Sequence, residues 1–173
     1  VHVVWSNTWF DPAREKEAAV SLLDIGADVI AQHQDSPVPQ QAAQDRGVYS
    51  IGYNSDMSAF APKAFLAAPV WNWGPYYEKV VRSVMEGTWT NAQYWGGIKD
   101  GTVDIVLSDL VPSGVAKLVM SMRTAIIKGD MHPFVGPIYD QAGNLKYAEG
   151  EIPSDGDLLS MDWFINNVVG KIQ

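Results

Sequence analysis

Cysteine is absent from the 173 residues. This absence excludes disulfide bonds, thiolate nucleophiles and cysteine-based zinc or iron–sulfur sites. The formal net charge is −8 and no basic run occurs, which argues against nucleic acid or an anionic membrane as a partner. No apolar run is long enough to span a bilayer, and no signal peptide is recognisable in a chain that begins at Val1. A globular enzyme or binding protein remains.

Motifs for phosphate binding and for catalysis are also missing. The chain has no glycine-rich phosphate loop and no GxSxG element. His2, His33 and His132 are too widely spaced to suggest a metal site. Two carboxylates, Asp35 and Asp56, have the chemistry for acid–base catalysis, but no residue pattern supplies a nucleophile or an activated water. We therefore expect binding without chemistry, and no cofactor.

The N-terminal part of the chain alternates short apolar runs with helical patterns. This alternation is typical of βαβ units and a parallel sheet, a Rossmann-like α/β fold. We predict strands at Val1–Trp5, Ala27–Ala31, Val48–Tyr53 and Ala64–Val70, and helices at Pro12–Ile25, Pro39–Asp45 and Pro75–Glu86. The prediction gives a ligand-binding lobe over residues 1–98.

The remainder, residues 99–173, has a different pattern and is predicted to cross to a second body. We expect strands at Tyr94–Ile98 and Val103–Leu107 around a Lys99–Gly101 turn, and a helix at Val115–Ile127. A hairpin is expected from Phe134–Asp140 and Leu145–Ala148. Ser154 and Asp157 resemble a capping box that begins a final helix running to Val169.

The stretch Ser6–Pro12 joins the first predicted strand to the first helix. Asp11 is a typical helix N-cap and Pro12 a typical first helical residue. In parallel sheets, ligands bind outside the carboxyl ends of the strands. The predicted strand ends carry polar and aromatic side chains: Asn7, Trp9, His33, Gln34, Asp35, Ser36, Asn54, Asp56, Trp71, Asn72 and Trp73. Indole faces with directional polar groups suit a nucleobase or nucleoside better than a phosphate.

Several of these residues have an alternative structural interpretation. Asp35 and Ser36 precede Pro37 and are equally suited to capping the next helix. Asp56 is equally suited to ordering its own turn. Trp71 and Trp73 alternate in strand register, so only one of them is expected to face a pocket.

The same residues resemble the basic membrane protein (BMP) family of ABC-transporter substrate-binding lipoproteins, of the purine-nucleoside receptor type. The matching stretches are WSNTWFDPAREKEAA, GADVIAQHQDSP, AAQDRGVYSIGYNSDM, YWGGIKDGTVDI and FVGPIYDQAGN. The resemblance implies one lobe of a type I periplasmic-binding-protein fold with a crossover segment, the first lobe lying outside this sequence. It also implies an extracytoplasmic receptor, anchored by a lipid outside this sequence, that passes its ligand to an ABC permease.

The resemblance also implies roles for individual residues. Trp9 is similar to the aromatic residue that stacks on the purine, and Asp56 to the carboxylate that accepts hydrogen bonds from ribose or base. Lys99 is similar to a lysine near the hinge that reaches the ligand. The loop His33–Pro37 replaces a glycine-rich loop of many members, which favours a free base such as adenine over a nucleoside. The alternatives are a nucleoside hydrolase using Asp35 and Asp56, and the ligand-sensing domain of a regulator.

Overall fold

Helix α1 (Pro12–Asp24) begins where the sequence provides a cap and a proline. The Asp11 side chain accepts a hydrogen bond from the Arg14 N–H at 3.2 Å, and Pro12 is the first helical residue. Gly26 follows the helix end with φ +94°, a conformation that glycine adopts without the steric cost of a Cβ. The predicted start and end of this helix are therefore confirmed.

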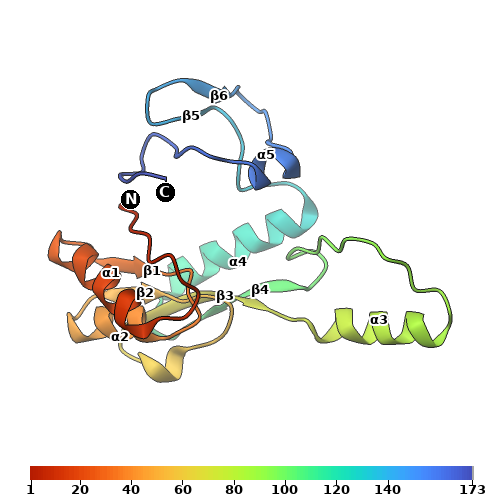
Figure 1. Ribbon diagram of the computed structural model, residues 1–173, viewed down its shortest axis with the longest axis horizontal. Coiled ribbons are helices and arrows are strands. Elements are labelled where there is room, and N and C mark those ends of the chain that lie inside the picture. The colour runs from red at the N-terminus through yellow and green to blue at the C-terminus, as the bar shows by residue number, and fades with distance from the viewer. Residues whose placement is uncertain (173) are drawn as a thin grey trace.

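The computed structural model describes residues 1–172, and its centre is a four-stranded sheet (Figure 1). The strands lie in the order β1 (Val29–Ala31), β2 (Tyr49–Ile51), β3 (Phe65–Trp71) and β4 (Val103–Leu107). β1, β2 and β3 are parallel to one another, whereas β4 is antiparallel to β3. This arrangement confirms a mixed α/β fold with a mainly parallel sheet, and β4 extends the sheet beyond residue 98.

The core lies between one face of this sheet and the helices that cover it. α1 packs beside α2 (Val38–Asp45), and a short 3₁₀ turn, η1 (Ser58–Phe60), follows β2. The buried cluster consists mainly of small side chains, namely Ala19, Leu23, Ile30, Ala42, Ala43, Ala61 and Ala64. Alternate strand residues point to the other face, where Val29, Tyr49 and Ile51 are 40%, 48% and 37% exposed.

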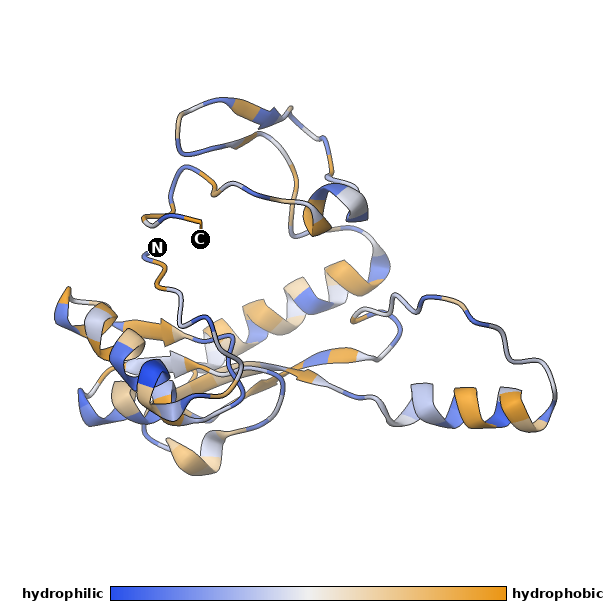
Figure 2. Ribbon diagram, in the orientation of Figure 1, coloured by the Kyte–Doolittle hydropathy of each residue, from blue (hydrophilic) through white to orange (hydrophobic). Residues whose placement is uncertain are grey.

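Two further helices extend away from this core. α3 (Gly74–Met85) projects from the end of β3, and α4 (Ser113–Lys128) runs from the sheet to a second, smaller body (Figure 1). Apolar residues recur along both helices (Figure 2), but neither helix contains a buried residue. Arg123 of α4 contacts Asp104 of β4 at 2.6 Å. Among residues 1–172, no helix has the length and apolarity needed to cross a membrane.

The small body contains the hairpin of β5 (Ile138–Tyr139) and β6 (Leu145–Tyr147) and the short helix α5 (Asp155–Leu159). The predicted hairpin is confirmed. The predicted capping box is also confirmed, because the Ser154 side chain accepts from the Asp157 N–H and the Asp157 side chain accepts from the Ser154 N–H.

The prediction of a sheet strand at Val1–Trp5 is wrong. This segment lies beside the C-terminal part of the chain instead (Figure 1). Val3 N–H donates to the Val169 carbonyl at 3.0 Å, and Val169 N–H donates to the Val1 carbonyl at 2.7 Å. Its backbone N–H and C=O groups therefore form hydrogen bonds with residues far along the chain. Local sequence patterns do not indicate such distant partners.

Two other predicted elements are also corrected. Residues 94–98 form no strand, so β4 pairs with β3 rather than with a neighbour across the Lys99 turn. The final helix ends at Leu159 instead of continuing to Val169. The residues that were expected to continue this helix instead form hydrogen bonds with the β5 region. Gln141 N–H donates to the Phe164 carbonyl, and Asn166 N–H donates to the Tyr139 carbonyl.

Candidate ligand-binding site

The carboxyl ends of the three parallel strands lie at one edge of the sheet, together with the turn before α1. Backbone hydrogen bonds join these segments. Asp35 N–H donates to the Trp9 carbonyl at 2.9 Å, and Trp71 N–H donates to the Asn54 carbonyl at 3.2 Å. The predicted convergence of loops is therefore present, although the first of the four contributions is a turn and not the end of a sheet strand.

Glu15 fixes the relation between the turn and the loop after β1. Its side chain is 1% exposed, and one carboxylate oxygen accepts from the Asp11 N–H at 2.7 Å. The other oxygen accepts from the Ser36 hydroxyl. Because a buried carboxylate needs such partners, Glu15 holds the entry to α1 against the loop that carries Asp35.

A series of aromatic rings runs along this edge, and we call it the ring series. It begins with Trp9 and His33, whose ring centres are 5.5 Å apart, and continues with Tyr53, stacked on His33 at 4.2 Å. Trp71 meets Tyr53 edge-to-face at 5.6 Å. The remaining members are Trp73, Tyr76, Tyr77 and Tyr94.

Trp9 lies at the open end of the ring series and is 63% exposed. An exposed indole provides a flat apolar face for another ring. Trp71 and Trp73 contact each other at 5.9 Å, are 46% and 37% exposed, and both belong to the series. That only one of the two faces a pocket stays a prediction.

Asp35 is exposed but held in place. Its Oδ1 accepts a hydrogen bond from the Asn54 side-chain amide at 2.7 Å. Burial, and then the negative charge of Asp35, raise the pKa of the Tyr53 hydroxyl above its ordinary value. Asp35 therefore links Asn54, through a hydrogen bond, to the charge environment of Tyr53 in the ring series.

Asp56 orders its own turn. Its Oδ1 accepts from the Ser58 N–H at 2.9 Å, and hydrogen bonds from Ser58 lower the pKa of the Asp56 carboxyl. The carboxylate is nevertheless exposed at the end of β2. Both interpretations of this residue remain compatible with its position.

The other predicted site residues take different positions. Gln34 donates to the Ser6 hydroxyl at 3.3 Å. Ser36 is 1% exposed, so it supports the loop and presents no group to a ligand in this conformation. Asn7 lines a shallow hollow with Arg14 of α1.

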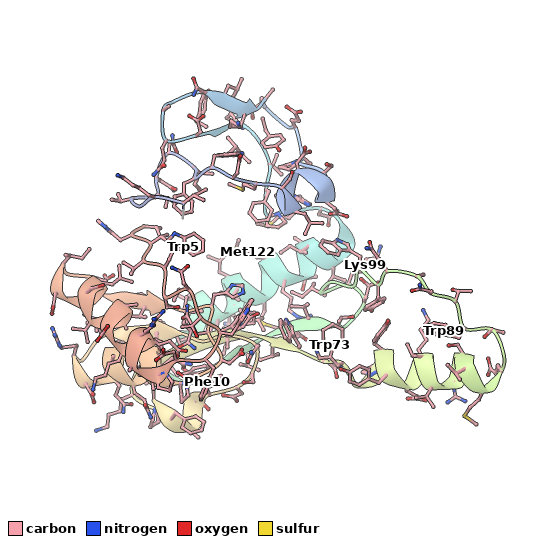
Figure 3. All side chains as sticks on the ribbon, in the orientation of Figure 1. Trp5, Phe10, Trp73, Trp89, Lys99 and Met122 are labelled. Atoms are coloured by element: carbon pink, nitrogen blue, oxygen red, sulfur yellow. The ribbon has the colours of Figure 1, made fainter. Side chains whose placement is uncertain are left out.

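Lys99 lies in an exposed turn that precedes β4 (Figure 3). The Asn72 side chain donates to the Gly101 carbonyl at 3.2 Å, and Asn72 N–H donates to the Thr102 carbonyl at 2.8 Å. These bonds fasten the turn to the carboxyl end of β3, from which Trp73 leads to α3 (Figure 3).

Sequence reasoning placed His33 and Asn54 at the strand ends that face the ligand, but it gave no site role to Tyr53 or Glu15. Tyr53 is the last residue of a predicted strand, and Glu15 lies four residues after a predicted cap. These positions in the sequence are the signals from which a role at the site could have been inferred. Among residues 1–172, no cluster of three or more histidine or acidic side chains is arranged to hold a metal ion.

Comparisons with known proteins identify a family and several relatives. Residues 1–131 match the family described as ABC transporter substrate-binding protein PnrA-like (Bmp). The chain is 41% identical to a purine-binding protein of Brucella abortus over 99% of its own length and 49% of the relative's. It is 34% identical to a putative ABC transporter glucose-binding protein of Haloferax volcanii over 88% of its length and 42% of the relative's. The chain thus spans about half the length of these curated relatives.

Solved structures show the same fold. A transcriptional activator of the comK gene from Bacillus halodurans superposes with a TM-score of 0.64 at 23% identity, covering 74% of this chain and 46% of the other. A solute-binding protein of an ABC transporter system from Conexibacter woesei gives 0.58 at 19% identity, covering 75% and 44%.

Proposed function

Because the chain belongs to the PnrA-like family of ABC transporter substrate-binding proteins, we propose that it binds a purine base or nucleoside outside the cytoplasm. The bound purine passes to the permease of an ABC importer. The ligand is bound and released without chemical change, and no cofactor takes part. Support comes from the purine-binding relative and from the exposed indole of Trp9, whose carbonyl accepts a hydrogen bond from the Asp35 N–H.

The observation that carries the proposal is the exposure of Trp9 at the open end of the ring series. A purine stacked on this indole gains the contact energy of two flat rings. Asp56 and Asp35 then accept hydrogen bonds from N–H or O–H groups on the ligand's edge. Asn7, Gln34 and Trp71 line the same edge.

Binding is completed by a first lobe that closes on residues 1–98, while residues 99–173 return to it. Gln173 lies outside the described residues. Lys99, at the start of the returning segment, reaches the ligand when the lobes close. Such closure is a hinge motion, favoured because the ligand contacts both lobes at once. A lipid anchor outside this sequence keeps the receptor at the membrane.

A free base such as adenine is the preferred form of the ligand. The loop His33–Pro37 fills the space where a glycine-rich loop of many members leaves room for a sugar, and its His33 ring is stacked on Tyr53 at 4.2 Å. Adenosine is therefore expected to bind more weakly than adenine. Equal or tighter binding of adenosine would contradict this preference.

The test is isothermal titration of adenine into the protein with its first lobe included. Trp9→Ala should weaken binding by about tenfold or more, since stacking on an aromatic contributes about 0.5–1.5 kcal/mol beyond the buried area. Trp9→Phe keeps a ring and should recover most of the affinity. Phe10→Ala, at the neighbouring exposed aromatic, is the matched control and should bind adenine normally.

A sugar is the competing ligand class, favoured by the glucose-binding relative. Glucose is therefore titrated in parallel. Saturable heat with glucose and none with adenine or adenosine would replace the purine proposal. Conversion of adenosine to products by stoichiometric protein would instead favour a hydrolase.

A further inference from the structure

The carboxylate of Asp35 is an exposed acceptor at the proposed site whose direction is fixed by hydrogen bonds. Its backbone N–H is bonded to the Trp9 carbonyl at 2.9 Å, so its side chain leaves the chain next to the residue that presents the indole. Its Oδ1 is bonded to Asn54 at 2.7 Å. The direction of the carboxylate is thus set from two neighbouring loops.

The loop that carries Asp35 is held in place by hydrogen bonds from Gln32 and to Glu15. The side-chain amide of Gln32 donates to the carbonyls of Gln34 and Ser36, at 2.9 and 2.8 Å. The Ser36 hydroxyl is bonded to buried Glu15. A loop held by three such bonds presents its exposed carboxylate without having to reorder when a ligand arrives.

Asn54 has a backbone suited to this role. Its φ is +58°, the left-handed region that asparagine tolerates better than most residues. Its carbonyl accepts from the Trp71 N–H at 3.2 Å, so both its main chain and its side chain are engaged. Asn54 therefore acts as a positioning residue for Asp35.

An ionised carboxylate accepts hydrogen bonds and donates none. It is complementary to a ligand edge that carries N–H donors, and it repels a carbonyl oxygen at the same place. Adenine and hypoxanthine have nearly the same size and stack alike, but carry an amino group and an oxo group respectively at the same ring position. A site with a fixed carboxylate distinguishes between them by charge complementarity rather than by shape.

We infer that Asp35, oriented by Asn54, selects ligands whose edge carries an amino group over oxo analogues of the same shape. This inference rests on the proposed purine function and adds the determinant of its specificity. Hydrogen bonds to charged groups correspond to about 10- to 100-fold in affinity. The native protein is therefore expected to prefer adenine to hypoxanthine by at least about tenfold.

The experiment titrates adenine and hypoxanthine into the protein with its first lobe included, and compares the ratio of dissociation constants. In Asp35→Asn the amide both donates and accepts, so the ratio should fall below about threefold while both bases still bind. Asn54→Gly keeps the left-handed backbone accessible but removes the orienting amide, and should give an intermediate ratio. Circular dichroism verifies that each variant is folded.

Asp45→Asn is the control, since it removes an exposed carboxylate at the C-terminal end of α2, near the opposite edge of the sheet, and should leave the ratio unchanged. Adenine binding with an equal affinity for hypoxanthine, or a native ratio in Asp35→Asn, would overturn the inference and leave the proposed function standing. No binding of either base by the native protein would overturn both.

Discussion

Glu15 shows how one buried side chain determines the shape of an exposed site. Its carboxylate is shared between the Asp11 N–H and the Ser36 hydroxyl. The sequence predicted the cap at Asp11 and the helix that follows, because both depend on neighbouring residues. The sequence did not indicate that Glu15 reaches across to Ser36, because that contact depends on how two loops pack.

Replacing Glu15 by alanine should destabilise the fold by about 2–4 kcal/mol, because the buried Ser36 hydroxyl and the partly buried Asp11 N–H lose a charged acceptor. Urea-induced unfolding measures the change. Glu17→Ala, at an exposed position of the same helix, should change stability by less than about 0.5 kcal/mol. Equal effects of the two substitutions would show that the buried bonds contribute nothing.

At the scale of elements, the helices were predicted better than the strands. The cap at Asp11 and the glycine at position 26 mark the ends of α1 locally. A strand, in contrast, forms only where a neighbour supplies hydrogen bonds, and that neighbour is encoded elsewhere. Residues 94–98 have a strand-like composition yet form none, because β4 takes the place beside β3. The same rule applies to the candidate site. The convergence of the loops was predicted, but the contacts between them, such as the hydrogen bond from Asn54 to Asp35, were not predicted.

The attachment of α4 to the sheet is expected to depend on pH. Arg123 donates two hydrogen bonds to Asp104, at 2.6 and 2.7 Å, and these bonds lower the pKa of Asp104 below its ordinary value. The pair therefore stabilises the fold above about pH 4, and this contribution is lost as the pH falls through the lowered folded-state pKa.

Thermal unfolding of the native protein and of Asp104→Asn tests this expectation. The variant should have the lower Tm at pH 6, and the two Tm values should converge towards pH 3. A difference that stays constant over this range would mean that the ion pair does not stabilise the attachment. Asp109→Asn, an exposed neighbour of β4, is the control.

At the scale of the whole molecule, the sheet and the small body are joined twice, through α4 and through the segment before α1 (Figure 1). Trp5 strengthens the second connection. Its ring stacks on Phe164 at 6.3 Å between centres, and its indole N–H donates to the Lys171 carbonyl at 2.8 Å. This contact spans most of the chain and is not visible in any local pattern.

Trp5→Ala should loosen the small body without disturbing the site. Hydrogen–deuterium exchange should become faster at Val3 and Val169, whose amides bond across this connection, and remain unchanged in α1 and β1. Trp5→Phe, which keeps the ring and removes the N–H, should give a smaller increase. Faster exchange throughout α1 would show instead that the two bodies unfold as one unit.

The hydrogen bonds that join Val1 and Val3 to Val169 also bear on the order in which the molecule is assembled. The ribosome synthesises Val1 and Val3 well before Val169. Helices α1 and α2 and the parallel strands therefore emerge before the C-terminal partner of the N-terminal segment exists. Closing a loop of this length costs about 4–5 kcal/mol of chain entropy, which is repaid only once the sheet is in place. The edge proposed to bind the ligand is therefore assembled on the nascent chain first, and the connection between the sheet and the small body is formed last.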